Sequence, residues 1–453
     1  MNSKRRPQKN ARETALRALV RVEQDGAYLN LALPALLQNL APEDRSLAIQ
    51  LATGTVQHLN TLDWSVNTFS RRSIKTFTPW IRNLLRLSAF QILYLGRIPD
   101  YAVVDEAVRL ARRYGHRGVA GLVNALLRRL TTERSNLPWP DREHQPTEYL
   151  SLKQSQPQWL VSRLIRRFGF QEAEKWCIAC NKKPLTSVRP NSLRTNPDEL
   201  IVMLNNEGIN AVPSPAVPGM LRIEAGVSPA TTRSFRDGYF TIQGESSALV
   251  APLLSPKAGD TVVDLCSAPG GKSTHLAELI KDRGRIYAVE LHSHRLRLVE
   301  KAAARLGLQS ILPVMADGRS VERQDLSEPS AVLVDAPCSG LGVIRRLPEI
   351  KWRRREEDLP ALQTLQIELL SAAARILPPG GKLLYSVCTG EPEETARVVD
   401  AFTSANRQFS LEDLLPLLPK TLRNGLDDSQ TVTLWPQRHD LDGFYMALWR
   451  KKG

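Results

Sequence analysis

Long apolar runs are absent from this sequence. No stretch approaches the roughly 18 consecutive apolar residues that a membrane-spanning helix requires, so we expect no membrane partner. The basic start, MNSKRRPQKN, has no apolar segment behind it, which argues against a secretory signal. Cysteine is also scarce, with 5 residues among 453 and no paired array. That scarcity argues against a disulfide-stabilised secreted domain and predicts a cytoplasmic protein in a reducing compartment.

Acidic residues are outnumbered by basic ones. Lys and Arg total 61 against 47 Asp and Glu, which gives a formal net charge of +14. A surplus of this size favours a polyanionic partner, and nucleic acid fits better than a membrane surface. The ordinary hydrophobic content of 42% predicts packed cores, and the length predicts two to four domains.

The first predicted domain, residues 1–130, is helical throughout. Apolar residues recur at helical spacing from Ala11 onward, and we expect a disordered basic arm before it. Six arginines predict a positive face, although a solvated helix face explains any single one: Arg109, Arg112, Arg113, Arg117, Arg128 and Arg129. A polar, proline-containing linker is expected at residues 131–146.

The second predicted domain, residues 147–235, is a small α+β module. Its pattern predicts helices at 158–168, 171–181 and 198–206 and a strand at 185–193. Its basic residues suit RNA contact, although composition alone also allows a structural spacer. Cys177 and Cys180 form a CxxC pair, but no second pair of ligands at zinc spacing exists. We therefore expect both to be small core residues.

The third predicted domain, residues 236–453, is an α/β fold with a mostly parallel sheet. Short apolar strands alternate with helices, the last helix of this kind being expected at 362–377. Strands are predicted at 261–265, 285–289, 310–315, 331–335 and 382–388. A closing antiparallel hairpin is predicted from 431–435 and 444–449.

A tight turn joins the first of these strands to a helix and suits a nucleotide-like ligand. The turn comprises Cys266, Ser267, Ala268, Pro269, Gly270, Gly271 and Lys272. A P-loop NTPase would need glycine where Cys266 stands, and the dinucleotide pattern G-x-G-x-x-G is missing. The remaining ligand is S-adenosylmethionine (SAM), and Glu290, about 20 residues past the turn, is placed to take its ribose hydroxyls.

Acids and cysteines gather at the predicted carboxyl ends of the strands, where ligands bind in such sheets. Besides Glu290, this rim receives Asp317, Asp335, Cys338 and Cys388. Core packing accounts for one buried cysteine, but not for two cysteines facing one pocket. We expect Cys266 to be structural, with its backbone lining the turn.

Three motifs carry a resemblance to a known enzyme family: DLCSAPGGK at 264–272, DAPCSGLGVIRR at 335–346 and YSVCTGEPEE at 385–394. They resemble those of the NOL1/NOP2/Sun RNA 5-methylcytosine methyltransferases. The front segment resembles the all-α, RNA-binding NusB family through DRSLA, GTV, LRL, AVVDEAV and VNALLR. Together the parts resemble the RsmB (Fmu/Sun) family, which methylates small-subunit (16S) ribosomal RNA.

That resemblance implies a Rossmann-like SAM-dependent methyltransferase domain and a role for each rim residue. Cys388 would add to cytosine C6, and Cys338 would assist C5 proton removal and release of the adduct. Asp335 would bind the base edge and line the cofactor site, and Lys272 would either lower a cysteine pKa or orient the base. Asp317 would take the adenine amino group. We expect ribosomal RNA as partner and a monomer.

Three rival interpretations are weaker. A P-loop NTPase would use Asp335 as its Walker B acid but lacks the first glycine. A DNA-type cytosine enzyme would use Cys338 as nucleophile, which leaves Cys388 unexplained. A non-catalytic assembly or antitermination factor would lack a cysteine or acid of the set. The basic run KWRRR at 351–355 is either an RNA contact or a solvated charge run.

Overall fold

The computed structural model describes residues 10–38, 40–224, 228–423, 425–426 and 428–453. The expected basic arm, residues 1–9, lies outside the described residues. The chain divides into two compact units. We call Met1–Asn181 with Ile344–Arg353 the helical unit, and Lys182–Val343 with Arg354–Gly453 the sheet unit. Among the residues described, no helix is long and apolar enough to cross a membrane.

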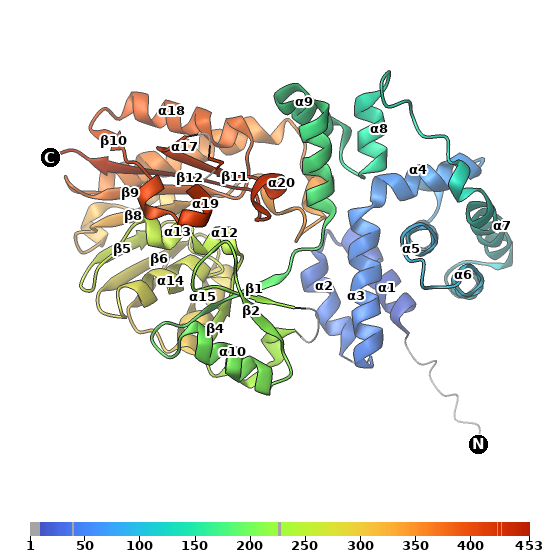
Figure 1. Ribbon diagram of the computed structural model, residues 1–453, viewed down its shortest axis with the longest axis horizontal. Helices are drawn as coiled ribbons and strands as arrows, with labels where there is room; N and C mark the ends of the chain where they lie inside the picture. Colours follow the sequence, from blue (N-terminus) through green and yellow to red (C-terminus); the bar gives the residue numbers. More distant parts are fainter. Residues whose placement is uncertain (1–9, 39, 225–227, 424, 427) are drawn as a thin grey trace. The chain divides into compact units, whose positions relative to one another are not determined.

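The helical unit confirms the all-α prediction for the front of the chain (Figure 1). Its helices are α1 (Ala11–Gln24), α2 (Leu29–Leu37), α3 (Pro42–Gln57), α4 (Leu59–Phe69), α5 (Pro79–Tyr94), α6 (Asp100–Tyr114), α7 (Arg117–Glu133), α8 (Pro146–Lys153), α9 (Gln158–Asn181) and α16 (Ile350–Arg353), with 3₁₀ turns η1 (Ile74–Thr76) and η2 (Arg134–Asn136). Gly169 interrupts α9 with a φ of 76°, a conformation that glycine adopts at little cost. It separates the two helices predicted there.

The core of the helical unit is built around α5. Nearly every residue of this helix from Ile81 to Ile92 is buried, as expected for a helix that neighbours surround on all sides. Its one buried arginine, Arg86, donates to both carboxylate oxygens of Asp63 at 2.6 and 2.7 Å. The pairing offsets the desolvation of both charges.

The segment Ile344–Arg353 corrects the interpretation of the basic run. Lys351 is only 2% exposed, and its Nζ donates to the carbonyl of Ser155 at 2.6 Å. Trp352 Nε1 donates to Val56 O at 2.6 Å, and Arg353 donates to Ala27 O at 2.5 Å. These three residues are therefore anchors inside the helical unit, neither RNA contacts nor a solvated run. Carbonyls of Ser155 and Ala27, both in connecting segments, accept the hydrogen bonds that the charged side chains need on burial.

The sheet unit begins with a small antiparallel sheet in the order β2-β3-β1-β4. Its elements are β1 (Thr186–Pro190), α10 (Pro197–Asn206), β2 (Ala211–Pro213), β3 (Leu221–Ile223), η3 (Pro229–Thr231), α11 (Arg233–Arg236) and β4 (Phe240–Ile242). Leu200 and Leu204 of α10 pack on Val188 and Phe240 of the sheet. This α+β arrangement confirms the fold predicted for the middle of the chain.

The large sheet has the order β10-β12-β9-β8-β5-β6-β7, with β11 paired to β12. Its strands are β5 (Thr261–Asp264), β6 (Arg285–Glu290), β7 (Ile311–Met315), β8 (Ala331–Asp335), β9 (Lys382–Val387), β10 (Phe409–Leu411), β11 (Thr431–Leu434) and β12 (Phe444–Lys451). The pairs among β5 to β9 are parallel, and β12 runs antiparallel to β9. The predicted parallel strands and the closing hairpin are confirmed.

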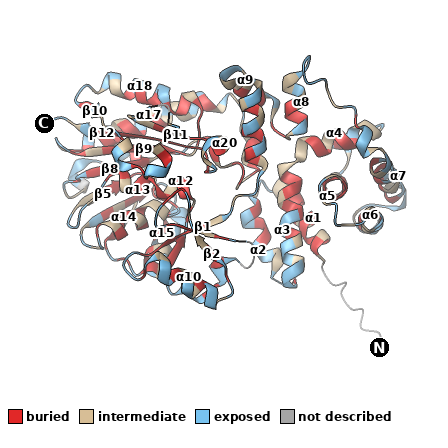
Figure 2. Cartoon of the chain, in the orientation of Figure 1, coloured by how far each residue is buried: buried red, intermediate tan, exposed pale blue. Residues whose placement is uncertain are grey.

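Helices cover both faces of this sheet. They are α12 (Glu245–Ala248), α13 (Val250–Leu253), α14 (Gly271–Leu279), α15 (Ser293–Leu306), α17 (Asp358–Ile376), α18 (Ala396–Ala405), α19 (Lys420–Arg423) and α20 (Pro436–His439), with 3₁₀ turns η4 (Gly318–Ser320), η5 (Arg323–Asp325), η6 (Leu341–Val343), η7 (Pro392–Glu394) and η8 (Leu415–Leu417). Val262 and Leu333 pack with α14 and α15, whereas their neighbours Val263 and Val334 pack with α17 and α18. Figure 2 shows the resulting buried strands between the two helical layers.

Strand order places a switch point beside β5. The chain builds β6 and β7 on one side of β5 and then crosses to build β8 and β9 on the other. Loops that leave β5 and β8 at their carboxyl ends therefore turn to opposite sides, and the crevice at such a switch point is where folds of this class bind ligands.

Candidate active site

The glycine turn sits at this switch point. Gly270 has a φ of 104°, and a Cβ there would lie 3.1 Å from the Cα of Val299, so only glycine fits the approach of the turn to α15. Asp264, at the end of β5, is buried and accepts a hydrogen bond from Ser273 Oγ at 2.7 Å. Burial raises the pKa of Asp264 to about 7.

Residues around the turn fit a cofactor with polar edges. Ser267 Oγ is buried and has no hydrogen-bond partner among the described residues. Glu290 is buried at the end of β6, where its Oε2 lies 3.5 Å from Arg295. Arg295 also donates to Ala268 O at 3.2 Å, which links the acid to the turn. A buried carboxylate beside an unpartnered hydroxyl suits a ligand that brings hydroxyl donors.

Asp317 follows β7 and is half-buried. A Cβ at the next residue, Gly318, would lie 2.8 Å from Leu265 O, so this loop lies against the glycine turn. Arg319 donates to both carboxylate oxygens of Asp317, to Oδ1 at 3.1 Å and to Oδ2 at 2.7 Å. These bonds lower the pKa of Asp317 and keep it ionised.

Asp335 and Lys272 form an ion pair on the same rim. Lys272 Nζ donates to Asp335 Oδ2 at 2.6 Å, and Ser386 Oγ donates to Oδ1 at 2.7 Å. Both carboxylate oxygens are thereby fixed in direction. The role of Ser386 escaped the sequence analysis, although a serine two residues before a cysteine at a strand end could have indicated it.

Cys338 and Cys388 meet across the ends of β8 and β9. Their Sγ atoms are 3.2 Å apart and both residues are half-buried. The hydrogen bond with Cys388, together with burial, raises the pKa of Cys338 well above its ordinary value, so Cys338 keeps its proton. Burial also raises the pKa of Cys266, in keeping with the structural role predicted for it.

The loop that carries Cys338 is tied to its surroundings by residues for which the sequence predicted no such contact. Gly342 N donates to Cys388 O at 2.9 Å, and a Cβ at Gly342 would lie 2.8 Å from that same oxygen. Arg354 donates to Cys338 O and Ser339 O. Glu394 accepts from Ser339 N at 2.7 Å. Only tertiary structure brings these residues together.

The CxxC pair lies in the core of the helical unit. Cys177 and Cys180 are 0% and 2% exposed inside α9, which confirms the expected core role. Among the described residues, no group of three or more His, Cys, Asp or Glu side chains is placed to hold a metal ion.

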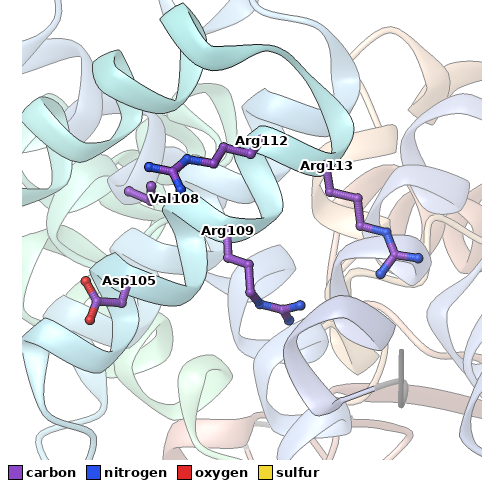
Figure 3. A pocket seen from close by; sticks show the side chains of 5 residues that line it. All are labelled: Asp105, Val108, Arg109, Arg112 and Arg113. Atoms are coloured by element: carbon purple, nitrogen blue, oxygen red, sulfur yellow. The ribbon is translucent and has the colours of Figure 1, made fainter. Parts of the chain in front are cut away.

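A shallow basic pocket lies on α6 of the helical unit (Figure 3). Its lining residues are Asp105, Val108, Arg109, Arg112 and Arg113. Arg109 is paired with Glu106 at 2.6 Å and Arg113 with Glu13 at 3.0 Å, whereas Arg112 is exposed. In Figure 3 the guanidinium groups of Arg109 and Arg113 point toward the lower right, and that of Arg112 points the other way, toward Val108.

Known proteins agree with this architecture. Family models match in three blocks: NusB at residues 9–132, a ferredoxin-like domain of RsmF/B-like methyltransferases at 156–229, and 16S rRNA methyltransferase RsmB/F at 251–450. The parallel sheet with its glycine turn is thus a methyltransferase domain. The chain belongs to the RsmB/F family of 16S rRNA methyltransferases.

Individual relatives span the whole chain. The probable ribosomal RNA small subunit methyltransferase B of Bacillus subtilis is 37% identical and covers 98% of this chain and 99% of its own. The ribosomal RNA small subunit methyltransferase B of Photorhabdus laumondii is 30% identical with the same coverage. The crystal structure of PH0851 has a TM-score of 0.82 at 29% identity and covers 97% of this chain and 98% of its own.

Proposed function

We propose that this chain methylates carbon 5 of a cytosine in small-subunit (16S) ribosomal RNA, using SAM and a covalent adduct to Cys388. The observation that carries the proposal is the 3.2 Å approach of the Cys338 and Cys388 sulfurs. Two thiols from different strand ends, beside the Asp335–Lys272 pair, match the two tasks of the reaction. One thiol must attack the base, and a second group must help to release it.

Cys388 would begin the reaction by adding to C6 of cytosine. The new S–C6 bond turns C5 into an enamine carbon, which is nucleophilic enough to take a methyl group. The turn at 266–272, with Glu290 and Asp317, would hold SAM, whose sulfonium would supply that methyl group and leave as the neutral thioether. Cys338 would then assist transfer of the C5 proton to a water molecule. The C–H electron pair restores the C5–C6 double bond, and the S–C6 bond breaks with its electron pair leaving on the Cys388 sulfur.

Asp335 and Lys272 would orient the base. The carboxylate of Asp335 faces donors on the cytosine edge, the exocyclic amino group and a protonated N3, and stabilises the charge that develops during addition. Lys272, already paired with Asp335 at 2.6 Å, holds the carboxylate in its direction. Ser386 holds the other carboxylate oxygen in place.

RNA would be held outside this crevice by the predicted domains at 1–130 and 147–235, while residues 236–453 perform the chemistry. The target base must leave its stack to reach the cysteines, which favours a loop or single-stranded region. The arginines of α6 would contact phosphates. We also propose that the protein acts as a monomer in the cytoplasm.

The decisive experiment compares Cys338→Ala and Cys388→Ala, each incubated with SAM and small-subunit ribosomal RNA. A denaturing gel reports the covalent adduct, and labelled methyl transfer reports product. We expect Cys338→Ala to accumulate adduct and Cys388→Ala to yield neither adduct nor product. Cys177→Ala is the matched control and should behave as the wild type. Adduct accumulation in Cys388→Ala instead would reverse the two roles.

A further inference from the structure

The peptide groups on both sides of Cys338 are held by side chains that take no part in the reaction described above. The peptide group that follows Cys338 is hydrogen-bonded at both its oxygen and its nitrogen. Its carbonyl oxygen accepts from Arg354 at 3.1 Å. Its N–H, which belongs to Ser339, donates to Glu394 at 2.7 Å. The orientation of this peptide plane fixes the ψ angle of Cys338.

The peptide that precedes Cys338 is held as well. Its carbonyl oxygen, on Pro337, accepts from Gln366 Nε2 at 3.0 Å. The same Gln366 nitrogen donates to Glu394 Oε1 at 3.0 Å, so the two grips share one buried network. Tyr385 OH, in β9, donates to the Glu394 carbonyl at 2.8 Å and secures the network from the sheet side.

These contacts are built for precision more than for stability. Glu394 and Gln366 are fully buried, and burying such groups is costly unless they are hydrogen-bonded. Arg354, Glu394 and Gln366 all form hydrogen bonds with the same short stretch of backbone around Cys338. A loop needs no such support merely to fold. The desolvation cost of burying these groups is expected where one side chain, here Cys338, must be held in one orientation.

We propose that Arg354 and Glu394 are positioning residues for Cys338. They hold its flanking peptide planes so that its sulfur stays 3.2 Å from that of Cys388. The inference rests on the proposed function, because it assigns Cys338 to adduct release. Loosening the grip should then impair the steps that Cys338 performs and spare the attack by Cys388.

The test uses the full-length chain with SAM and small-subunit ribosomal RNA. Arg354→Ala removes both donors to the Cys338 loop, and Arg354→Lys keeps the charge with a different donor geometry. Arg355→Ala is the matched control, because Arg355 is the next residue, is exposed and carries the same charge. For Glu394, the disruptive change is Glu394→Ala, and Glu394→Gln retains an acceptor oxygen for Ser339 N.

We expect Arg354→Ala to lower kcat roughly 10- to 100-fold, since misplacing a reacting group by about 1 Å has an effect of that order. The covalent adduct should accumulate as in Cys338→Ala, with a KM for RNA equal to that of Arg355→Ala. Arg354→Lys and Glu394→Gln should restore most of the turnover. Loss of protein folding, which a thermal melt detects, would remove adduct and product together and so looks different.

Two outcomes separate this inference from the proposed function. Adduct in Cys338→Ala but wild-type adduct levels and turnover in Arg354→Ala overturn the positioning role alone. A folded Arg354→Ala that forms neither adduct nor product also overturns it, because the loop would then serve Cys388. Absence of adduct in Cys338→Ala overturns the proposed function and this inference with it. Should Arg354→Ala melt early, Glu394→Ala decides by the same criteria.

Discussion

Two places in this molecule combine one lysine with two cysteines. In the helical unit, Lys351 interacts electrostatically with Cys177 and Cys180. In the sheet unit, Lys272 lies on the rim that carries Cys338 and Cys388. Each lysine nitrogen donates one hydrogen bond of 2.6 Å. The residue types are the same, yet only the second group is suited to chemistry.

The two groups differ in the hydrogen-bond partner of the lysine and in how deeply the lysine and the thiols are buried. Lys351 donates to a neutral carbonyl in a sealed core, so burial lowers its pKa to about 7. Burial likewise raises the pKa of Cys177 to about 12, which removes its reactivity. Lys272 faces a carboxylate, and the thiols on its rim are half-buried at strand ends. A list of reactive residue types is therefore a poor guide to a site until their partners are known.

Substituting each lysine in turn should test the difference between the two groups most clearly. Lys272→Met deprives Asp335 of its cation, and we expect kcat for methyl transfer to fall roughly 100-fold, as when one stabilising donor of a transition state is lost. Lys351→Met removes a charge from the helical core and should leave kcat within about twofold of wild type. Equal losses in the two variants, measured as methyl incorporation, would contradict the distinction.

The pH dependence of stability should sharpen the distinction between Lys351 and Lys272. Lys351 has a folded-state pKa of about 7, far below its ordinary value of 10.5, so the unfolded chain binds more protons between these values. The free energy of unfolding should therefore rise with pH, by about 2–3 kcal/mol from pH 7 to pH 9. This gain in the free energy of unfolding should be lost again as the pH falls back to 7 and below.

Denaturant unfolding across this pH window provides the measurement. Lys351→Met should lack that rise, because methionine does not titrate, while other groups contribute equally to both proteins. Parallel pH curves for wild type and variant would show that Lys351 is charged in the folded protein at pH 9.

A smaller effect is expected at the surface of α6. Arg112→Ala removes one exposed cation of the basic pocket and should weaken RNA binding a few-fold. The slope of log affinity against log salt concentration should fall by about 1, because one phosphate contact is lost. Arg407→Ala, which removes an exposed arginine of the sheet unit, is the control. An affinity that does not change with salt would contradict phosphate contact altogether.

Sequence patterns were sufficient for the parts that local physics decides. Strands β5 to β9 could be predicted because each is a short β-branched or apolar run that ends in a turn. Rim residues such as Asp335 and Cys338 followed from parallel strands ending at one edge. Three-residue strands such as β2 and β3 are too short to show any period.

The remaining features depend on contacts between distant residues. The burial of Lys351 required a carbonyl from Ser155, and no local pattern reports such a partner. Arg354 and Glu394 are both charged residues in charged surroundings, where a solvated position is the ordinary expectation. Their hydrogen bonds to the Cys338 loop form because the segment before α17 and the turn η7 after β9 both lie against that loop.

The segment Ile344–Arg353 has a consequence for the making of the protein. Its anchors complete the helical unit, yet they are encoded after most of the sheet unit's strands. Domains usually fold as they leave the ribosome, from the amino end onward. Here the unit that is translated first cannot close until Arg353 has emerged, so the order of synthesis and the order of completion differ. The loop that carries Cys338 is therefore translated before the helices at the front of the chain complete their packing.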